Sequence, residues 1–262
     1  MQEKAVSAVI PFRNLTTEVT REKKYYAGNL SVFSPDFSHS KVKRVSGLSK
    51  RYDDGRRKAS AADPLDDAAT IALVKQKLLE SSPKQGKRNY LIFLVGINCG
   101  LRCSDLLDLR IEDVWNEESQ SVIDKPRYIV HKLSREGKPR YANMYLNIYM
   151  KEAIKDYVLS LGDDCCGSDY LFSSAKRNCK SGGRLSTSSF YHILTKATKE
   201  LALDAHVGTH TMRKTCGRHI YKNSGLDAAR AALGHKSTET TLRYIGKTED
   251  EVEETFMSMA ML

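Results

Sequence analysis

Three separate segments of this chain carry arginine, histidine and tyrosine side chains that suit one common site. Arg102 stands in the first segment, His210 and Arg213 in the second, and His235 and Tyr244 in the third. His210 and Arg213 are three residues apart, a spacing that places two side chains on one face of a helix. Any fold that uses these residues together has to bring the three segments into contact.

The residue types suit the cleavage of a phosphodiester bond without a metal ion. Such a cleavage needs a nucleophile, positive charge at the two non-bridging oxygens and a proton for the departing oxygen. Arginine stays charged and its planar fork donates two hydrogen bonds, so Arg102 and Arg213 are the predicted phosphate clamp. The Tyr244 phenol has a reference pKa of about 10 and needs a base or a cationic pocket before it attacks.

Each of these side chains also has an ordinary structural interpretation. Arg102 could be a surface charge, His210 a satisfied helix histidine, and His235 a simple cap. Tyr244 could be one of 13 tyrosines that pack against the core. The order and the spacing of these five side chains favour the catalytic interpretation, because unrelated structural residues would not be expected to match both.

The combined pattern resembles that of the tyrosine recombinase (phage integrase) family. The first arginine of the family lies in a Gly-Leu-Arg-x-x-Glu-like turn, where this chain has Asp105 in place of the common glutamate. The second box, His-x-x-Arg, and the third, Leu-Gly-His followed nine residues later by tyrosine, are both present. The resemblance covers about residues 63–250 and implies a tyrosine recombinase catalytic-domain fold.

The resemblance also implies a mechanism. Tyr244 attacks the scissile phosphate and forms a 3′-phosphotyrosine link, while Arg102, Arg213 and His235 stabilise the negative charge. His210 takes the tyrosine proton and later returns it. A free 5′-hydroxyl of a partner strand then reverses the chemistry, so no ATP, cofactor or metal is expected.

A lysine on a β-hairpin serves as the general acid in the family, and this chain offers two in that region. Lys132 ends the first predicted strand of the hairpin, where the family lysine lies, and is preferred over Lys138. An alignment with a shorter loop would instead place Arg135 at this point. Both lysines could also do no more than contact phosphates.

The expected function is that of a site-specific DNA recombinase, or integrase. Alternatives are a type IB topoisomerase-like or resolvase activity, and a non-catalytic DNA-binding module that kept the fold. The expected partner is double-stranded DNA, on which a homotetramer assembles from a chain that is monomeric in solution. Accessory DNA-bending proteins are further expected partners, and a membrane is not.

Charge supports a polyanionic partner. The chain holds 42 Lys and Arg against 32 Asp and Glu, a net charge of +10. Residues 1–60 carry +7 of it, from 13 basic and 6 acidic residues, so this arm is a candidate DNA clamp or else a basic disordered tail.

The six cysteines lack zinc-site spacing, and the longest apolar run, Tyr90–Ile97, is too short to span a membrane. We therefore expect a cytoplasmic protein with reduced thiols, associated with the nucleoid when it acts on DNA.

The predicted fold is mainly α with a small antiparallel β-sheet, an α+β domain. A basic, poorly ordered arm (1–62) precedes the catalytic domain (63–248), and a helical tail (249–262) follows it. Apolar spacing and capping residues predict the helices, and alternation in residues 111–146 predicts three strands. The helices are Asp66–Leu79, Lys87–Cys99, Ser104–Leu109, Ile148–Leu161, Ser186–Leu203, Thr209–Asn223, Leu226–Leu233 and a last one reaching Tyr244, and the strands are Ile111–Trp115, Tyr128–Leu133 and Tyr141–Leu146.

Overall fold

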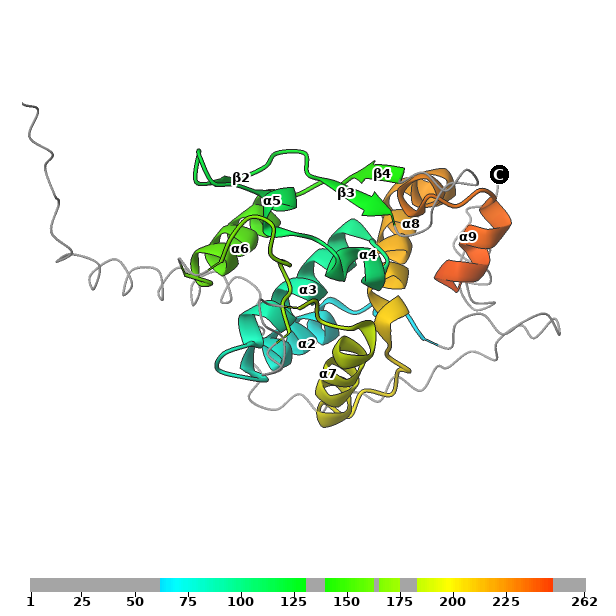
Figure 1. Cartoon of the computed structure of the whole chain (residues 1–262). Helices are drawn as coiled ribbons and strands as arrows, with labels where there is room; N and C mark the ends of the chain where they lie inside the picture. The colour runs from blue at the N-terminus through cyan, green and yellow to red at the C-terminus, as the bar shows by residue number, and fades with distance from the viewer. Residues whose placement is uncertain (1–61, 131–139, 163–164, 175–182, 247–262) are drawn as a thin grey trace, which may run out of the picture. The chain divides into compact units, whose positions relative to one another are not determined.

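The structure, a computed structural model, describes residues 62–130, 140–162, 165–174 and 183–246. All of them belong to one unit of the chain, Gly47–Leu262. The described part is mainly helical with two small antiparallel sheets, as predicted (Figure 1). Its elements are α2 (Ala68–Glu80), α3 (Gly86–Cys99), α4 (Cys103–Leu107), α5 (Ile111–Val114), β1 (Trp115–Asn116), β2 (Ser121–Val122), β3 (Arg127–Val130), β4 (Arg140–Asn143), α6 (Ile148–Leu159), α7 (Thr187–Glu200), α8 (Thr209–Leu233) and α9 (Thr238–Ile245).

Helix α3 is central to the packing and lies against α2, α6 and α8 (Figure 1). Its apolar run places side chains in the core on most sides, and Ile92 and Phe93 are fully buried. The helix ends at Gly100, whose φ of 63° is the left-handed conformation that glycine favours. A Cβ on Gly100 would lie 3.0 Å from Cys216 Sγ, so the glycine also lets α8 approach this turn. The chain continues from the turn directly into Arg102.

Helix α8 consists of two helical pieces separated at Gly225. This glycine has φ 82° and ψ 178°, outside the helical region. The break confirms that Thr209–Asn223 and Leu226–Leu233 are two helices, as predicted, which follow each other directly in the chain. The second piece ends at Gly234, whose φ of 60° turns the chain toward α9.

The two sheets each contain two antiparallel strands. Strands β3 and β4 pair with Tyr128 opposite Ala142 and Ile129 opposite Tyr141, in the region where two strands were predicted. Strands β1 and β2 pair through Trp115 and Val122, and sequence reasoning missed this second sheet. Two-residue strands are too short for alternation to reveal them.

The strand predicted over Ile111–Trp115 is wrong. Residues Ile111–Val114 form the short helix α5, and the strand begins only at Trp115. The Asp113 carboxylate accepts a hydrogen bond of 2.7 Å from the Arg110 backbone amide and so caps the helix start. Ile111 and Val114 are both buried, and this apolar spacing fits a helical turn, whereas a five-residue run by itself does not separate the two periods.

Several predictions fall on residues that the structure does not describe. They concern the basic arm, up to residue 61, the hairpin lysines Lys132 and Lys138 with Arg135, and the helical tail 249–262. Among the described residues, no helix combines the length and apolar character that crossing a membrane requires. The same residues contain no cluster of His, Cys, Asp and Glu that could hold a metal ion.

Gly96 allows α3 and α8 to pack closely, and a side chain at this position should destabilise the fold. A Cβ on Gly96 would lie 2.5 Å from Sδ and 3.1 Å from Cβ of the fully buried Met212. Overpacking of this kind costs about 1–3 kcal/mol. We expect Gly96→Ala to lower the free energy of unfolding, measured by urea denaturation, by that amount. The cost should be smaller in a Met212→Ala background, and equal costs in both backgrounds would contradict this account.

Candidate active site

The Arg213 guanidinium connects the two turns that carry Arg102 and His235. Its Nη1 donates a hydrogen bond of 2.5 Å to the Gly100 carbonyl oxygen, and its Nη2 donates to the Leu233 carbonyl oxygen. Gly100 follows α3, and Leu233 ends α8. Arg213 itself is only 7% exposed. One buried side chain therefore holds together chain segments that are distant in sequence.

Arg102 lies in the turn between α3 and α4, with its side chain partly exposed. Its Nη1 is 3.8 Å from Oδ2 of Asp105, which lies in the first turn of α4 and is almost fully buried. Burial lowers the pKa of Arg213, and Asp105 is among the charges that oppose this effect. Asp105, which stands where the first motif commonly has glutamate, thus supplies a buried carboxylate that interacts with both arginines.

His235 is oriented by α9. It follows Gly234, and its Nδ1 is 3.1 Å from Oγ1 of the fully buried Thr241. The Thr241 hydroxyl donates to the Ser237 carbonyl oxygen at 3.2 Å, so its oxygen is free to accept the Nδ1 proton of His235. This network assigns the neutral tautomer with the proton on Nδ1 and leaves Nε2 for another partner.

Tyr244 is surrounded by the side chains of the other two segments. Its Oη lies 3.3 Å from Nδ1 of His210, within hydrogen-bond distance. The His235 ring stands edge-on to the Tyr244 ring, with centroids 5.1 Å apart and planes at 82°. Arg218 of α8 donates a hydrogen bond of 2.8 Å to the Gly246 carbonyl oxygen and so fixes the end of α9. The structure therefore brings Tyr244, His210 and His235 into one cluster.

The electrostatic environment keeps His210 neutral and the phenol protonated in the free protein. Burial lowers the pKa of His210, and the charges of Lys214, Arg213 and Arg102 lower it further. Burial raises the pKa of Tyr244, whereas Arg213 and Arg102 oppose that rise. A neutral imidazole nitrogen beside a phenol is the arrangement that general-base catalysis requires.

Sequence reasoning missed three side chains that belong to this cluster. Lys214 is buried, with Nζ 5.5 Å from the centre of the Tyr244 ring. Thr241 orients His235, as described above. Burial first and then Asp105 raise the pKa of Tyr128 in β3, and both arginines oppose this rise, so Tyr128 shares the electrostatic environment of the site. Spacing could have identified Lys214, because it lies one helical turn after His210.

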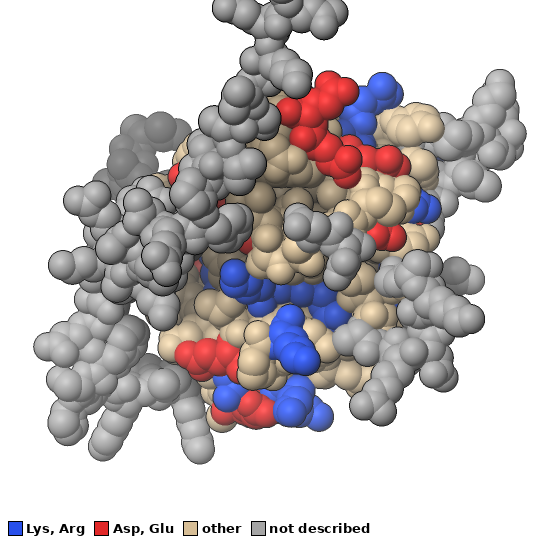
Figure 2. Space-filling view, turned by 60° about the vertical axis from the view of Figure 1, so that its left-hand side comes forward, with Lys and Arg blue, Asp and Glu red and all other residues tan. Residues whose placement is uncertain are grey.

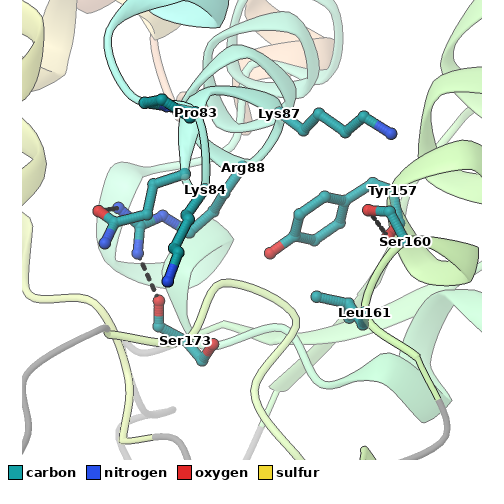
Figure 3. Close-up of a pocket in the computed structure, with 9 residues that line it drawn as sticks. Pro83, Lys84, Lys87, Arg88, Tyr157, Ser160, Leu161 and Ser173 are labelled. Carbon is teal, nitrogen blue, oxygen red and sulfur yellow. Dashed lines mark hydrogen bonds between the residues drawn. The ribbon is translucent and has the colours of Figure 1, made fainter.

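A pocket lies apart from this cluster, at the other end of α3. Its cavity volume is about 490 Å³ (Figure 3). Helix α3 has 14 residues and is therefore about 21 Å long, which separates the pocket from the turn at Arg102. The residues that line the pocket include Lys84, Lys87, Arg88, Tyr157, Ser160 and Ser173.

Basic side chains form a band on the face shown in Figure 2, with acidic ones on both sides of it.

Known protein sequences match most of this chain. Residues 72–251 match the profile of the phage integrase family. A probable integrase/recombinase of Bacillus subtilis, YoeC, is 33% identical over 188 residues, which are 71% of this chain and 91% of that protein. A tyrosine recombinase of Pseudothermotoga lettingae is 28% identical, over 67% of this chain and 55% of that protein. The chain thus spans about half the length of the second relative.

Solved structures share the fold. The crystal structure of XerA recombinase has a TM-score of 0.53 at 23% identity, over 74% of this chain and 65% of that one. A post-cleavage complex of XerH site-specific recombinase with its palindromic difH substrate has a TM-score of 0.55 at 21% identity, over 74% and 52% of the two chains. The predicted fold is confirmed by these similarities.

His210 and His235 should make the stability of the protein depend on pH. Burial is the first cause that lowers the pKa of both His210 and His235 below the value of 6.5 that applies to the unfolded chain. The unfolded chain therefore binds more protons below pH 6.5, so the free energy of unfolding should fall as the pH is lowered through this value. Urea denaturation at pH 7.5 and at about pH 5.5 measures the difference.

A variant with both His210→Asn and His235→Asn is the control for this dependence. It should lose less stability than the wild type between the same two pH values, because it lacks both imidazoles. An equal loss in the variant would show that other groups cause the dependence.

Proposed function

This chain belongs to the phage integrase family, and we propose that it cleaves and rejoins DNA strands through a covalent bond between Tyr244 and a 3′-phosphate. The single observation that carries the proposal is the 3.3 Å approach of Tyr244 Oη to His210 Nδ1, in a cluster with two arginines. The predicted function class, a site-specific DNA recombinase, is confirmed by the family and the relatives described above. Neither of the alternative functions is favoured by them.

The cleavage step follows from these contacts. Tyr244 Oη attacks the scissile phosphorus while the phenol proton moves to His210 Nδ1. The bond from phosphorus to the 5′-oxygen breaks, and the departing oxygen takes a proton from a general acid. In the reverse step a free 5′-hydroxyl gives its proton back to the general acid and attacks the phosphotyrosine. The bond from phosphorus to Tyr244 Oη breaks, and His210 returns the proton to the phenol. The energy of the bond is conserved, so no ATP is consumed.

The arginines are suited to hold the reacting phosphate. A guanidinium has five N–H donors. Arg213 uses two of them on carbonyl oxygens and also hydrogen-bonds the Tyr244 side chain, so further donors are left for a phosphate beside that phenol. Arg102 is more exposed and lies at the same site. His235 would bind a phosphate oxygen through a protonated Nε2, and an anionic phosphate nearby raises the imidazole pKa and favours that form.

The hairpin lysine completes the proposed set of catalytic groups. The electrostatic interactions of Tyr128 in β3 with Arg213 and Arg102 support a general acid from this hairpin. Lys132 follows β3 by only two residues, so it is preferred over Lys138 as the general acid.

We also propose double-stranded DNA as the partner of this chain, bound in a homotetramer. The net charge of +10 favours a polyanion, and the basic segment 1–60 would contact phosphates. XerH, which shares the fold, was solved bound to its difH substrate. The proposals extend to a monomer in solution, accessory DNA-bending proteins and association with the nucleoid during the reaction.

The nucleophile can be tested by removing one oxygen atom. Wild-type protein should form a covalent product on nicked suicide substrates tiled across the DNA that flanks its gene, visible as a shifted band on a denaturing gel. Tyr244→Phe should form none while its DNA binding, measured by gel shift, is unchanged. A covalent band that persists in Tyr244→Phe would refute the assignment, and a wild type that binds but never forms a band would contradict the proposed cleavage.

The general acid can be tested with a modified leaving group. A thiol has a reference pKa of about 8.5, well below that of an alcohol, so a 5′-sulfur at the scissile bond departs without a proton donor. Lys132→Ala should cleave ordinary DNA at least about 100-fold more slowly, and the 5′-sulfur substrate at nearly the wild-type rate. Lys138→Ala is the matched control and should cleave both substrates normally. Sulfur rescue of Lys138→Ala alone would transfer the role to Lys138.

A further inference from the structure

Lys214 is a buried cation beside the candidate nucleophile. It follows Arg213 on α8 and lies one helical turn after His210, so it shares a face with that histidine. The residue is only 6% exposed. A charged side chain that is buried beside a candidate nucleophile is itself a candidate for a functional role.

The ammonium group lies against the ring of Tyr244. Its Nζ is 5.5 Å from the ring centroid, within the distance of about 6 Å at which a cation is attracted to an aromatic ring. We propose that Lys214 is a positioning residue of strand cleavage, whose ammonium group favours the phenolate of Tyr244 and the uncharged form of His210. The inference rests on the proposed function, because it assigns a role within that cleavage step.

Two electrostatic effects support this role. A positive charge over the ring stabilises a phenolate more than a phenol, since part of the phenolate charge is spread over the ring. The Lys214 charge also lowers the pKa of His210, second only to burial, and thereby keeps Nδ1 ready to accept the phenol proton. The first effect favours loss of the Tyr244 proton. The second makes His210 a weaker base, but it keeps the imidazole uncharged, and so able to accept that proton, down to a lower pH.

Other charged and titratable groups around Tyr244 come from several elements. Among the described residues near Tyr244 and Lys214, Asp105 is the carboxylate that enters the interactions of the two arginines. Glu239 of α9 pairs with the exposed Arg243 of the same helix at 2.7 Å. Titratable groups that interact electrostatically with these residues or with their neighbours include His210, Arg213 and Cys216 of α8, His235, Arg102 with Asp105 of α4, Cys99 of α3 and Tyr128 of β3.

Two measurements on Lys214→Met and Lys214→Arg test the proposal. The first follows the His210 ring by NMR during a pH titration without DNA. The second measures covalent product on the suicide substrate from about pH 5.5 to about pH 9. Methionine keeps the length of the side chain and removes the charge, whereas arginine keeps the charge. Lys196→Met, which removes an exposed lysine from α7, is the control for the loss of one positive charge, and thermal unfolding reports on folding.

In Lys214→Met we expect the titration midpoint of His210 to rise by about half a pH unit to one unit. The rising limb of the cleavage profile should move to higher pH in the same variant, so that the loss is about tenfold at pH 6 and smaller at pH 9. Lys214→Arg should recover most of the wild-type profile, and Lys196→Met should follow the wild type throughout.

Two results would overturn the role of Lys214. One is an unchanged His210 titration in Lys214→Met. The other is an equal loss of cleavage at every pH accompanied by a lower melting temperature, which would indicate a structural role. A wild type that forms no covalent product at any pH would instead contradict the proposed function, and the NMR titration distinguishes that failure from a failure of the lysine assignment.

Discussion

The two hydrogen bonds from the Arg213 guanidinium to the carbonyl oxygens of Gly100 and Leu233 are the interaction on which the site depends. Gly100 ends α3 and Leu233 ends α8, and each carbonyl lies two residues before a side chain of the site, Arg102 or His235. A buried guanidinium is costly unless its donors are satisfied. The same contacts therefore place the turns that carry Arg102 and His235 and satisfy the buried charge of Arg213.

Positive charge dominates this site in the free protein, and its consequences can be traced through the ionisable groups. Arg102, Arg213 and Lys214 lower the pKa of His210, and the two arginines also oppose the effect of burial on Tyr244. Asp105 offsets part of the charge. A DNA phosphate would supply the anion that such a cluster favours, and its arrival would change the histidines and the tyrosine together. In the proposed mechanism, binding of the substrate and activation of the nucleophile would therefore be coupled.

Sequence reasoning predicted correctly the helices beside the motifs, because glycines mark their ends. Gly100, Gly225 and Gly234 mark the helix ends around the motifs, and the structure has left-handed or non-helical conformations at all three. The short helix Ile111–Val114 was mistaken for a strand because a run of this length is too short for apolar spacing to distinguish a helix from a strand. Lys214 was missed because a lysine on a helix is ordinarily solvated: its spacing from His210 indicates a shared helix face, but its burial against Tyr244 depends on the tertiary structure.

Identification of the residue that carries DNA after cleavage tests the account most directly. The covalent product trapped on a suicide substrate can be digested with nuclease and protease, and the modified peptide sequenced by mass spectrometry. The account predicts a nucleotide attached through phosphate to Tyr244, the residue that directly follows Arg243. A nucleotide on another of the 13 tyrosines, or on a residue of a different type, would contradict the proposed arrangement of the site.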